Sequence, residues 1–289
     1  MTQAVVIDFS KIGQAAATSE DMTVNKTFER ELPKAGVALC RLLSYVETGR
    51  HESTNPTHKP SLRAILTFEL SHKKHLIEID GKFVPSTVQV RVNKGVTSKS
   101  GFRKLFNVMN DACGGDHQHM AEMIGKPFLA EIFHNTVGEG DKAKTYANFD
   151  KDGAYSFKEP VRVDLDTEEK TPINVMELHG TPSCFLWENE AITDDVLVAM
   201  WESIYIEGTR EVEDPKTKEK KEVSKNWIQE TIMSNLEWEG SRTQALTQEH
   251  IVLDEHLTLP EETNTTSKAS SSLADAAVNG DAFDDAIIY

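Results

Sequence analysis

The sequence predicts a mainly β fold of the α+β kind: a five-stranded barrel with one inserted helix, a helical and hairpin C-terminal extension, and a disordered acidic tail. Three observations predict it. Apolar segments of strand length recur between residues 36 and 150, with turn signals between them. Residues 98–109 change to helical spacing. The chain after residue 254 is small, polar and acidic, with almost nothing to bury.

These shifts in composition divide the chain into four parts. With 289 residues, of which 38% are hydrophobic, the chain can bury a sizeable core. We expect an N-terminal arm (1–30), a barrel (31–160), an extension packed on the barrel (161–253) and a tail with a protein-docking tip (254–289).

The first half of the barrel is predicted as antiparallel strands. The first strand, 36–46, is long and rich in apolar residues, and 62–70 and 76–79 follow it. Asp80-Gly81 is a tight-turn signal, and residues 88–92 alternate as a half-buried strand does. We therefore expect an antiparallel meander.

The second half contains the helix and the last strands. Residues 98–109 place Phe102, Leu105, Phe106 and Met109 at helical spacing behind a serine cap. A short helix is expected over 117–124, and strands over 126–134 and 145–150. Three strands, a helix and two strands is the order of an OB-fold, a small barrel that binds oligonucleotides. Another mixed α+β domain would give the same order.

The extension reads as irregular chain followed by two helices. Residues 171–187 contain Pro172 and Pro182, and a helix capped by Thr193 is expected over 194–205. A polar hairpin (206–222) precedes a second helix over 224–238. We expect both helices to pack beside the barrel, with their tryptophans in the core in preference to a DNA-binding surface.

Charge is distributed unevenly along the chain. The net charge of −16 by itself argues against a nucleic-acid binder. Residues 31–160, however, carry 18 Lys and Arg against 15 Asp and Glu, together with seven of the ten histidines, whereas residues 161–289 carry 10 against 28. This asymmetry indicates a basic binding face coupled to an acidic end that faces partners or competes for that face.

Several classes of function are disfavoured. The three cysteines are far apart and odd in number, which indicates neither disulfides nor a zinc knuckle. The pairs Asp164/Asp166 and His117/His119 lack further ligands at motif spacing, and there is no GxxxxGK phosphate loop. We expect no catalysis, cofactor or metal. Without a signal peptide or membrane span, an intracellular protein is expected.

A protein that binds single-stranded nucleic acid without reading its sequence needs cations along the phosphates and aromatic rings on which the bases stack. Three phenylalanines are candidates for base stacking: Phe83, Phe68 and Phe149. For Phe68 and Phe149 the alternative is a position in the core. Tyr45 and Tyr146 are favoured, because each ends a predicted strand near a basic loop. Alternation places Gln89 and Arg91 on one face, as a groove wall. The predicted DNA-binding residues are Arg41, Tyr45, Arg50, Lys59, Arg63, Lys73, Lys74, Arg91, Lys94, Lys99, Arg103, Lys142, Lys144 and Tyr146.

The chain also resembles a known family. In this order its motifs are similar to tailed-phage OB-fold single-stranded DNA-binding proteins, and the likeness covers about two thirds of the chain. The long insertion from 161 to 222 departs from a minimal OB-fold. The motifs that carry the resemblance are Ala35-Gly36-Val37-Ala38-Leu39-Cys40-Arg41-Leu42, Leu66-Thr67-Phe68-Glu69-Leu70, Ser98-Lys99-Ser100, Ile124-Gly125-Lys126-Pro127, Phe133-His134-Asn135, Lys144-Thr145-Tyr146-Ala147-Asn148, Ser224-Lys225-Asn226-Trp227-Ile228-Gln229-Glu230 and Glu239-Gly240-Ser241.

The last nine residues, Asp281–Tyr289, resemble the acidic C-terminal tip of bacterial-type single-stranded DNA-binding proteins, which docks on replication partners. A solubilising tail is the alternative. The tip residues expected to dock are Phe283, Asp284, Asp285, Ile287, Ile288 and Tyr289.

Together the resemblances imply a protein that coats and protects single-stranded DNA in phage replication and recombination, in the cytoplasm of an infected bacterium. They imply recruitment of replication and recombination proteins, and a homo-oligomer or cooperative filament on DNA. The alternative is a non-enzymatic phage structural or adaptor protein without DNA affinity.

Overall fold

The computed structural model describes residues 32–53, 57–79, 81–138, 143–213 and 220–248. The chain divides into two units, Met1–Leu32 and Pro33–Tyr289, and the description below concerns the second. The expected N-terminal arm, the acidic tail with its docking tip, and Lys142 lie outside the described residues.

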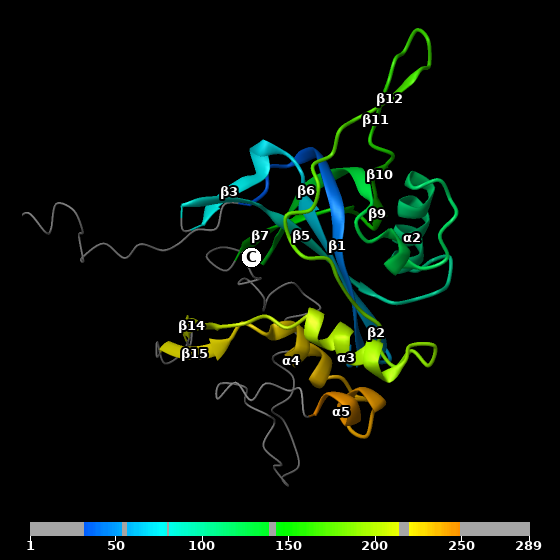
Figure 1. The fold of residues 1–289 in the computed structure, drawn as a ribbon. Coiled ribbons are helices and arrows are strands. Elements are labelled where there is room, and N and C mark those ends of the chain that lie inside the picture. Colours follow the sequence, from blue (N-terminus) through cyan, green and yellow to red (C-terminus); the bar gives the residue numbers. More distant parts are fainter. Residues whose placement is uncertain (1–31, 54–56, 80, 139–142, 214–219, 249–289) are drawn as a thin grey trace, which may run out of the picture. The chain divides into compact units, whose positions relative to one another are not determined.

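A seven-stranded sheet forms the centre of the fold (Figure 1). Its path runs β10-β6-β1-β2-β5, with β7 paired to β6 and β13 paired to β1, and every pairing is antiparallel except the last. The predicted mainly β class is therefore confirmed. The strands are β1 (Gly36–His51), β2 (Ser61–Leu70), β5 (Thr87–Asn93), β6 (Pro127–Val137), β7 (Lys144–Asn148), β10 (Phe157–Lys158) and β13 (Ser183–Phe185).

Strand β1 is longer than predicted and is irregular at two places. Its register against β2 shifts between Leu42 and Ser44, and again between Glu47 and Gly49. The first shift changes which residues face inward, because an extra residue in a strand reverses the alternation that follows it. Cys40 and Leu42 are buried before the shift, and Tyr45 joins the same core after it.

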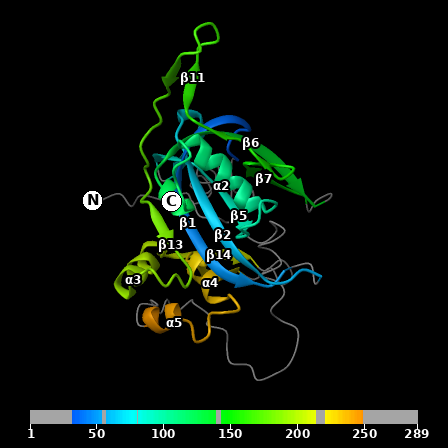
Figure 2. The ribbon, with the colours of Figure 1, turned by 90° about the vertical axis from the view of Figure 1, so that its right-hand side faces the viewer.

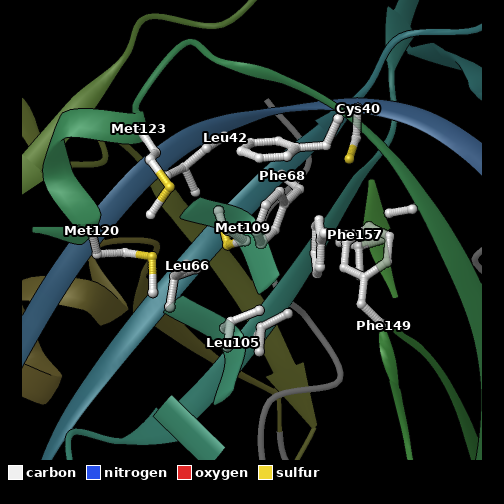
Figure 3. Close-up of a cluster of buried hydrophobic side chains, with 14 of the residues drawn as sticks. Cys40, Leu42, Leu66, Phe68, Leu105, Met109, Met120, Met123, Phe149 and Phe157 are labelled. Atoms are coloured by element: carbon white, nitrogen blue, oxygen red, sulfur yellow. The ribbon is translucent and has the colours of Figure 1, made fainter. Parts of the chain in front are cut away.

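The first core fills one side of this sheet, where helix α2 (Gly101–Ala112) packs (Figure 3). Ser100 caps the helix by accepting a hydrogen bond from the Arg103 backbone N–H, as predicted. Aromatic rings from three strands and a loop meet beside it: Phe68, Phe128 and Phe157 lie within 6.4 Å of one another by ring centroid, and Phe149 lies 5.2 Å from Phe68. Phe68 and Phe149 are thus core residues.

Four short hairpins lie outside the large sheet, each as a two-stranded sheet of its own. The expected meander is wrong at one point, because β5 pairs directly with β2 and the intervening strand forms a separate hairpin. The hairpins are β3 (Leu76–Ile79) with β4 (Lys82–Pro85), β8 (Asp150–Lys151) with β9 (Ala154–Tyr155), β11 (Val161–Val163) with β12 (Lys170–Pro172), and β14 (Thr209–Glu213) with β15 (Lys220–Ser224). Short 3₁₀ turns are η1 (Lys73–His75) and η2 (Met120–Met123).

A second core forms where the extension meets the sheet. Figures 1 and 2 show helices α3 (Asp194–Ser203), α4 (Trp227–Met233) and α5 (Arg242–Thr247) together at one end of β1 and β2. Val46 of β1 and Ile65 of β2 belong to this core. It also contains all four tryptophans, Trp187, Trp201, Trp227 and Trp238. The core position predicted for the tryptophans of the two helical segments is thus confirmed.

The predicted helix over 224–238 is wrong in length, because α4 ends at Met233. The chain leaves the helix at Asn235, and the Leu236 backbone N–H donates to the carbonyl of Arg50 in β1 at 2.8 Å. A tertiary hydrogen bond thus replaces the next helical turn. No helix among the described residues is long and apolar enough to cross a membrane.

Candidate nucleic-acid interface

Arg41 lies in β1, but its guanidinium group fastens the extension to the sheet. Nε donates to the Met176 carbonyl at 2.8 Å, Nη1 to the Gly125 carbonyl at 2.8 Å, and Nη2 to the Val175 carbonyl at 3.0 Å. Nη2 also pairs with the exposed Glu177 carboxylate at 2.9 Å. The donors of Arg41, which was predicted as a DNA contact, are thus directed at the protein's own chain.

Tyr45 is also misplaced by the prediction, because it is fully buried and offers no face to a base. Its hydroxyl donates to Glu47 Oε1 at 2.8 Å, and its ring meets His119 edge-on at 5.4 Å. Lys94 Nζ reaches the same Glu47 oxygen at 2.6 Å. Burial raises the pKa of Glu47, but hydrogen bonds from His119 and Lys94 outweigh it and leave the pKa below its ordinary value. Lys94 thus balances a buried carboxylate and is not free for phosphate.

Two further arginines are held by their neighbours. Arg50 Nε pairs with Glu237 at 2.7 Å and its Nη1 donates to the Pro60 carbonyl at 3.4 Å. Arg63 is half-buried, donates to the Glu52 carbonyl, and has a pKa lowered by burial. Both therefore act within the fold near the end of β1.

Arg91 and Gln89 do share one face of β5, as the alternation predicts, and lie 3.4 Å apart by Nη2 and Oε1. The guanidinium carbon of Arg91, however, lies 5.1 Å from the ring centroid of Trp227 in α4. Burial lowers the pKa of Arg91 to about 10, which still leaves the group charged at neutral pH. Helix α4 thus packs against Arg91 on the face that was expected to form a groove wall. Tyr146 on β7 is half-buried.

The outer face of β2 is covered as well. Glu69 is buried there, and its two carboxylate oxygens accept the backbone N–H groups of His179 and Gly180, each at 2.8 Å. A Cβ at Gly180 would lie 3.2 Å from both Leu43 methyl groups and 3.3 Å from Glu69 Oε2. This close approach fixes the extension against β1 and β2, so that surface is closed to a ligand.

The remaining predicted cations lie on the surface. Arg103 lies over the ring of Phe106 at 5.4 Å, and Lys144 is half-buried with interactions of its own. Lys74 is exposed and donates from Nζ to the Val37 carbonyl at 2.9 Å. The other exposed members of the predicted set are Lys59, Lys73 and Lys99.

Lys34 and Lys82 are surface cations that the prediction missed. Lys34 precedes β1 and Lys82 begins β4, and both are exposed. Within the part of the chain that the structure describes, Lys34, Lys73 and Lys82 make no ion pair. These residues and Lys74 lie on or next to the β3–β4 hairpin and the start of β1, and no local pattern in the sequence groups them.

His75 lies beneath these cations and is 3% exposed. Neither ring nitrogen has a hydrogen-bond partner among the described residues, and the hydroxyls of Ser71 and Ser86 share that property. Burial, followed by the charges of Lys74, His72 and Lys34, lowers the pKa of His75 to about 4. Burial and the positive charges nearby thus both favour the neutral ring.

The other candidates for a small-molecule or metal site are weak. The described residues hold no group of three or more His, Cys, Asp or Glu side chains that could bind a metal. An open depression of about 400 Å³ lies between α3 and β13, lined by apolar groups and by Asp195. Its charge does not suit phosphate. No protein-family model matches this chain, and no curated protein or solved structure matches it either.

Proposed function

We propose that this chain is a single-stranded DNA-binding protein built on an OB-fold. The strand order supports the proposal: β5, β2, β1, β6 and β7 follow one another across the sheet, and α2 connects β5 to β6. That is the order of an OB-fold. No ladder joins β5 to β7 among the described residues, but the two strands are in contact, as the partly open barrel of this fold requires.

The observation that carries the proposal is this strand order in a part of the chain with excess positive charge. Residues 31–160 have a net charge of +3 inside a protein of −16. A sheet domain that only needed to be soluble would gain nothing from this asymmetry, whereas a polyanion ligand is attracted by it. We infer that the protein coats and protects single strands in phage replication and recombination, in the infected host's cytoplasm.

The acidic end completes the proposal. Asp281–Tyr289 is acidic and then apolar, and we propose that it recruits replication and recombination proteins. As a polyanion on the same chain it also competes weakly with DNA for the cations, and salt screens that competition.

The test is fluorescence anisotropy of a labelled oligo-dT with full-length protein across a salt series, with a duplex of equal length as the control. We expect preference for the single strand and a log–log salt slope of about −3, for about four phosphates contacted. Removal of Asp281–Tyr289 should tighten binding or leave it unchanged, and should abolish partner recruitment. No binding at low salt by either form would overturn the proposal and favour a structural or adaptor protein without DNA affinity.

A further inference from the structure

The β3–β4 hairpin carries an aromatic ring that the fold does not use. Phe83 is 66% exposed, and every other aromatic side chain in the described part of the chain is buried or half-buried. Its neighbour Val84 is buried and anchors the strand, and its cross-strand partner is the exposed Glu78. Phe83 can therefore be removed without opening a cavity in either core.

The hairpin is separate from the large sheet. β3 and β4 pair only with each other among the described strands, and Ser71 and Ser86 stand at its two ends. Three backbone hydrogen bonds fasten this base: Ser86 N–H donates to the His75 carbonyl at 2.9 Å, Leu70 N–H to the Ser86 carbonyl at 3.0 Å, and Ser71 N–H to the Leu39 carbonyl at 2.8 Å. The side chains of Ser71, His75 and Ser86 add none. The ring is thus presented on a two-stranded arm of its own, whose base is fastened to β1 and β2 through the backbone.

The lysines on this arm and near its base suit an anion. Lys73 and Lys82 are exposed and belong to the hairpin segment, and Lys74 and Lys34 are close enough to His75 to lower its pKa. None of the four forms an ion pair with a described carboxylate. An exposed ring beside unpaired lysines combines the two contacts that a single-stranded nucleic acid offers, a base face and a phosphate.

The face of the large sheet that an OB-fold uses for binding is covered in this protein. In an OB-fold the face of the second and third strands is the usual binding surface, and those strands correspond to β2 and β5. Here Glu69 holds the 179–180 backbone over that face, and Trp227 lies against Arg91. A bound single-stranded nucleic acid must therefore make its aromatic contact beside this covered face.

We infer that the β3–β4 hairpin is a base-stacking arm, on which Phe83 stacks against an unpaired base while Lys73, Lys74, Lys82 and Lys34 contact the adjoining phosphates. The inference rests on the proposed function and assigns its aromatic contact. The ligand is a single-stranded nucleic acid recognised by the π-face of its bases and by its backbone charge, without a sequence code.

The experiment compares full-length wild-type protein with Phe83→Ala, and Leu165→Ala serves as the matched control because Leu165 is 93% exposed on the β11–β12 hairpin. Affinity is measured by anisotropy for an oligo-dT and for an abasic oligonucleotide of equal length and charge. Loss of one stacked base should weaken oligo-dT binding by about 5- to 150-fold in Phe83→Ala. The abasic strand should bind both proteins within about twofold, and Leu165→Ala should match wild type on both probes.

A second variant reports the contact directly. Phe83→Trp should restore affinity, and its added fluorescence should be quenched by oligo-dT but not by the abasic strand. Equal binding of oligo-dT by wild type and Phe83→Ala would overturn the inference while leaving the proposed function in place. An equal loss of affinity for oligo-dT and for the abasic strand would show that Phe83 has a structural role. A smaller sedimentation coefficient for Phe83→Ala would show that the ring makes contacts between copies of the protein. Either result would overturn the inference. Absence of wild-type binding would instead overturn the proposed function.

Discussion

Replacement of Arg41 by methionine separates a structural role from a DNA contact. The side chain keeps its apolar stem but loses donors to three backbone carbonyls, at 2.8, 2.8 and 3.0 Å. A net contribution of about 1 kcal/mol for each bond gives a loss of about 3 kcal/mol in the free energy of unfolding. The Glu177 pair adds little, because that carboxylate is 89% exposed.

The assay is urea unfolding followed by tryptophan fluorescence, together with anisotropy of labelled oligo-dT under conditions where the variant is folded. Lys59→Met is the matched control, because Lys59 is exposed and has no ion pair among the described residues. We expect Arg41→Met to unfold at lower urea concentration and to bind DNA within about twofold of wild type, whereas Lys59→Met should keep wild-type stability. An Arg41→Met protein with wild-type stability and much weaker DNA binding would refute the reasoning.

Two further predictions concern buried ionisable groups. Glu69→Gln leaves one accepting oxygen for the two N–H groups of His179 and Gly180, so the free energy of unfolding should fall by about 1–3 kcal/mol; an unchanged urea midpoint would contradict this. Burial first, and nearby positive charge second, lower the pKa values of His75 and His51 to about 4, below the ordinary 6.5. The unfolded chain therefore binds more protons between these values, and stability should decrease as pH falls from about 6.5 to 4. His75→Gln should flatten that decrease in urea midpoints measured against pH, and an unaltered slope would show that His75 is not its source.

The sequence predicted those elements whose signals are local. Helix α2 follows from its apolar spacing and the Ser100 cap, and the buried positions of Trp201 and Trp227 follow from the apolar helices that carry them. Tyr45 was misplaced because β1 continues to His51, so that Tyr45 lies within the strand and not at its end, and the register shift after Leu42 places it in the core. Local alternation carries no information about such a shift.

The binding residues were harder to predict, because residues far away in the sequence decide which cations are accessible. Arg41 is bonded to residues more than 130 positions away, and Arg91 is covered by α4 from a similar separation. A list of cations cannot distinguish a guanidinium group that fastens the extension from one that is free. Phe83 was among the predicted aromatic candidates, but only its exposure distinguishes it from Phe68 and Phe149.

Strand β13 gives the long insertion a protective role in the sheet. It pairs in parallel with Ser44, Tyr45 and Val46 on the edge of β1 opposite β2, beyond the stretch that β6 covers. A shortened protein ending near residue 160 would expose the backbone N–H and C=O groups of that edge, with the apolar Val46 beside them. Open strand edges of this kind pair with other copies and aggregate. The segment that contains β13 therefore protects the longest strand of the sheet from pairing with another copy of the chain.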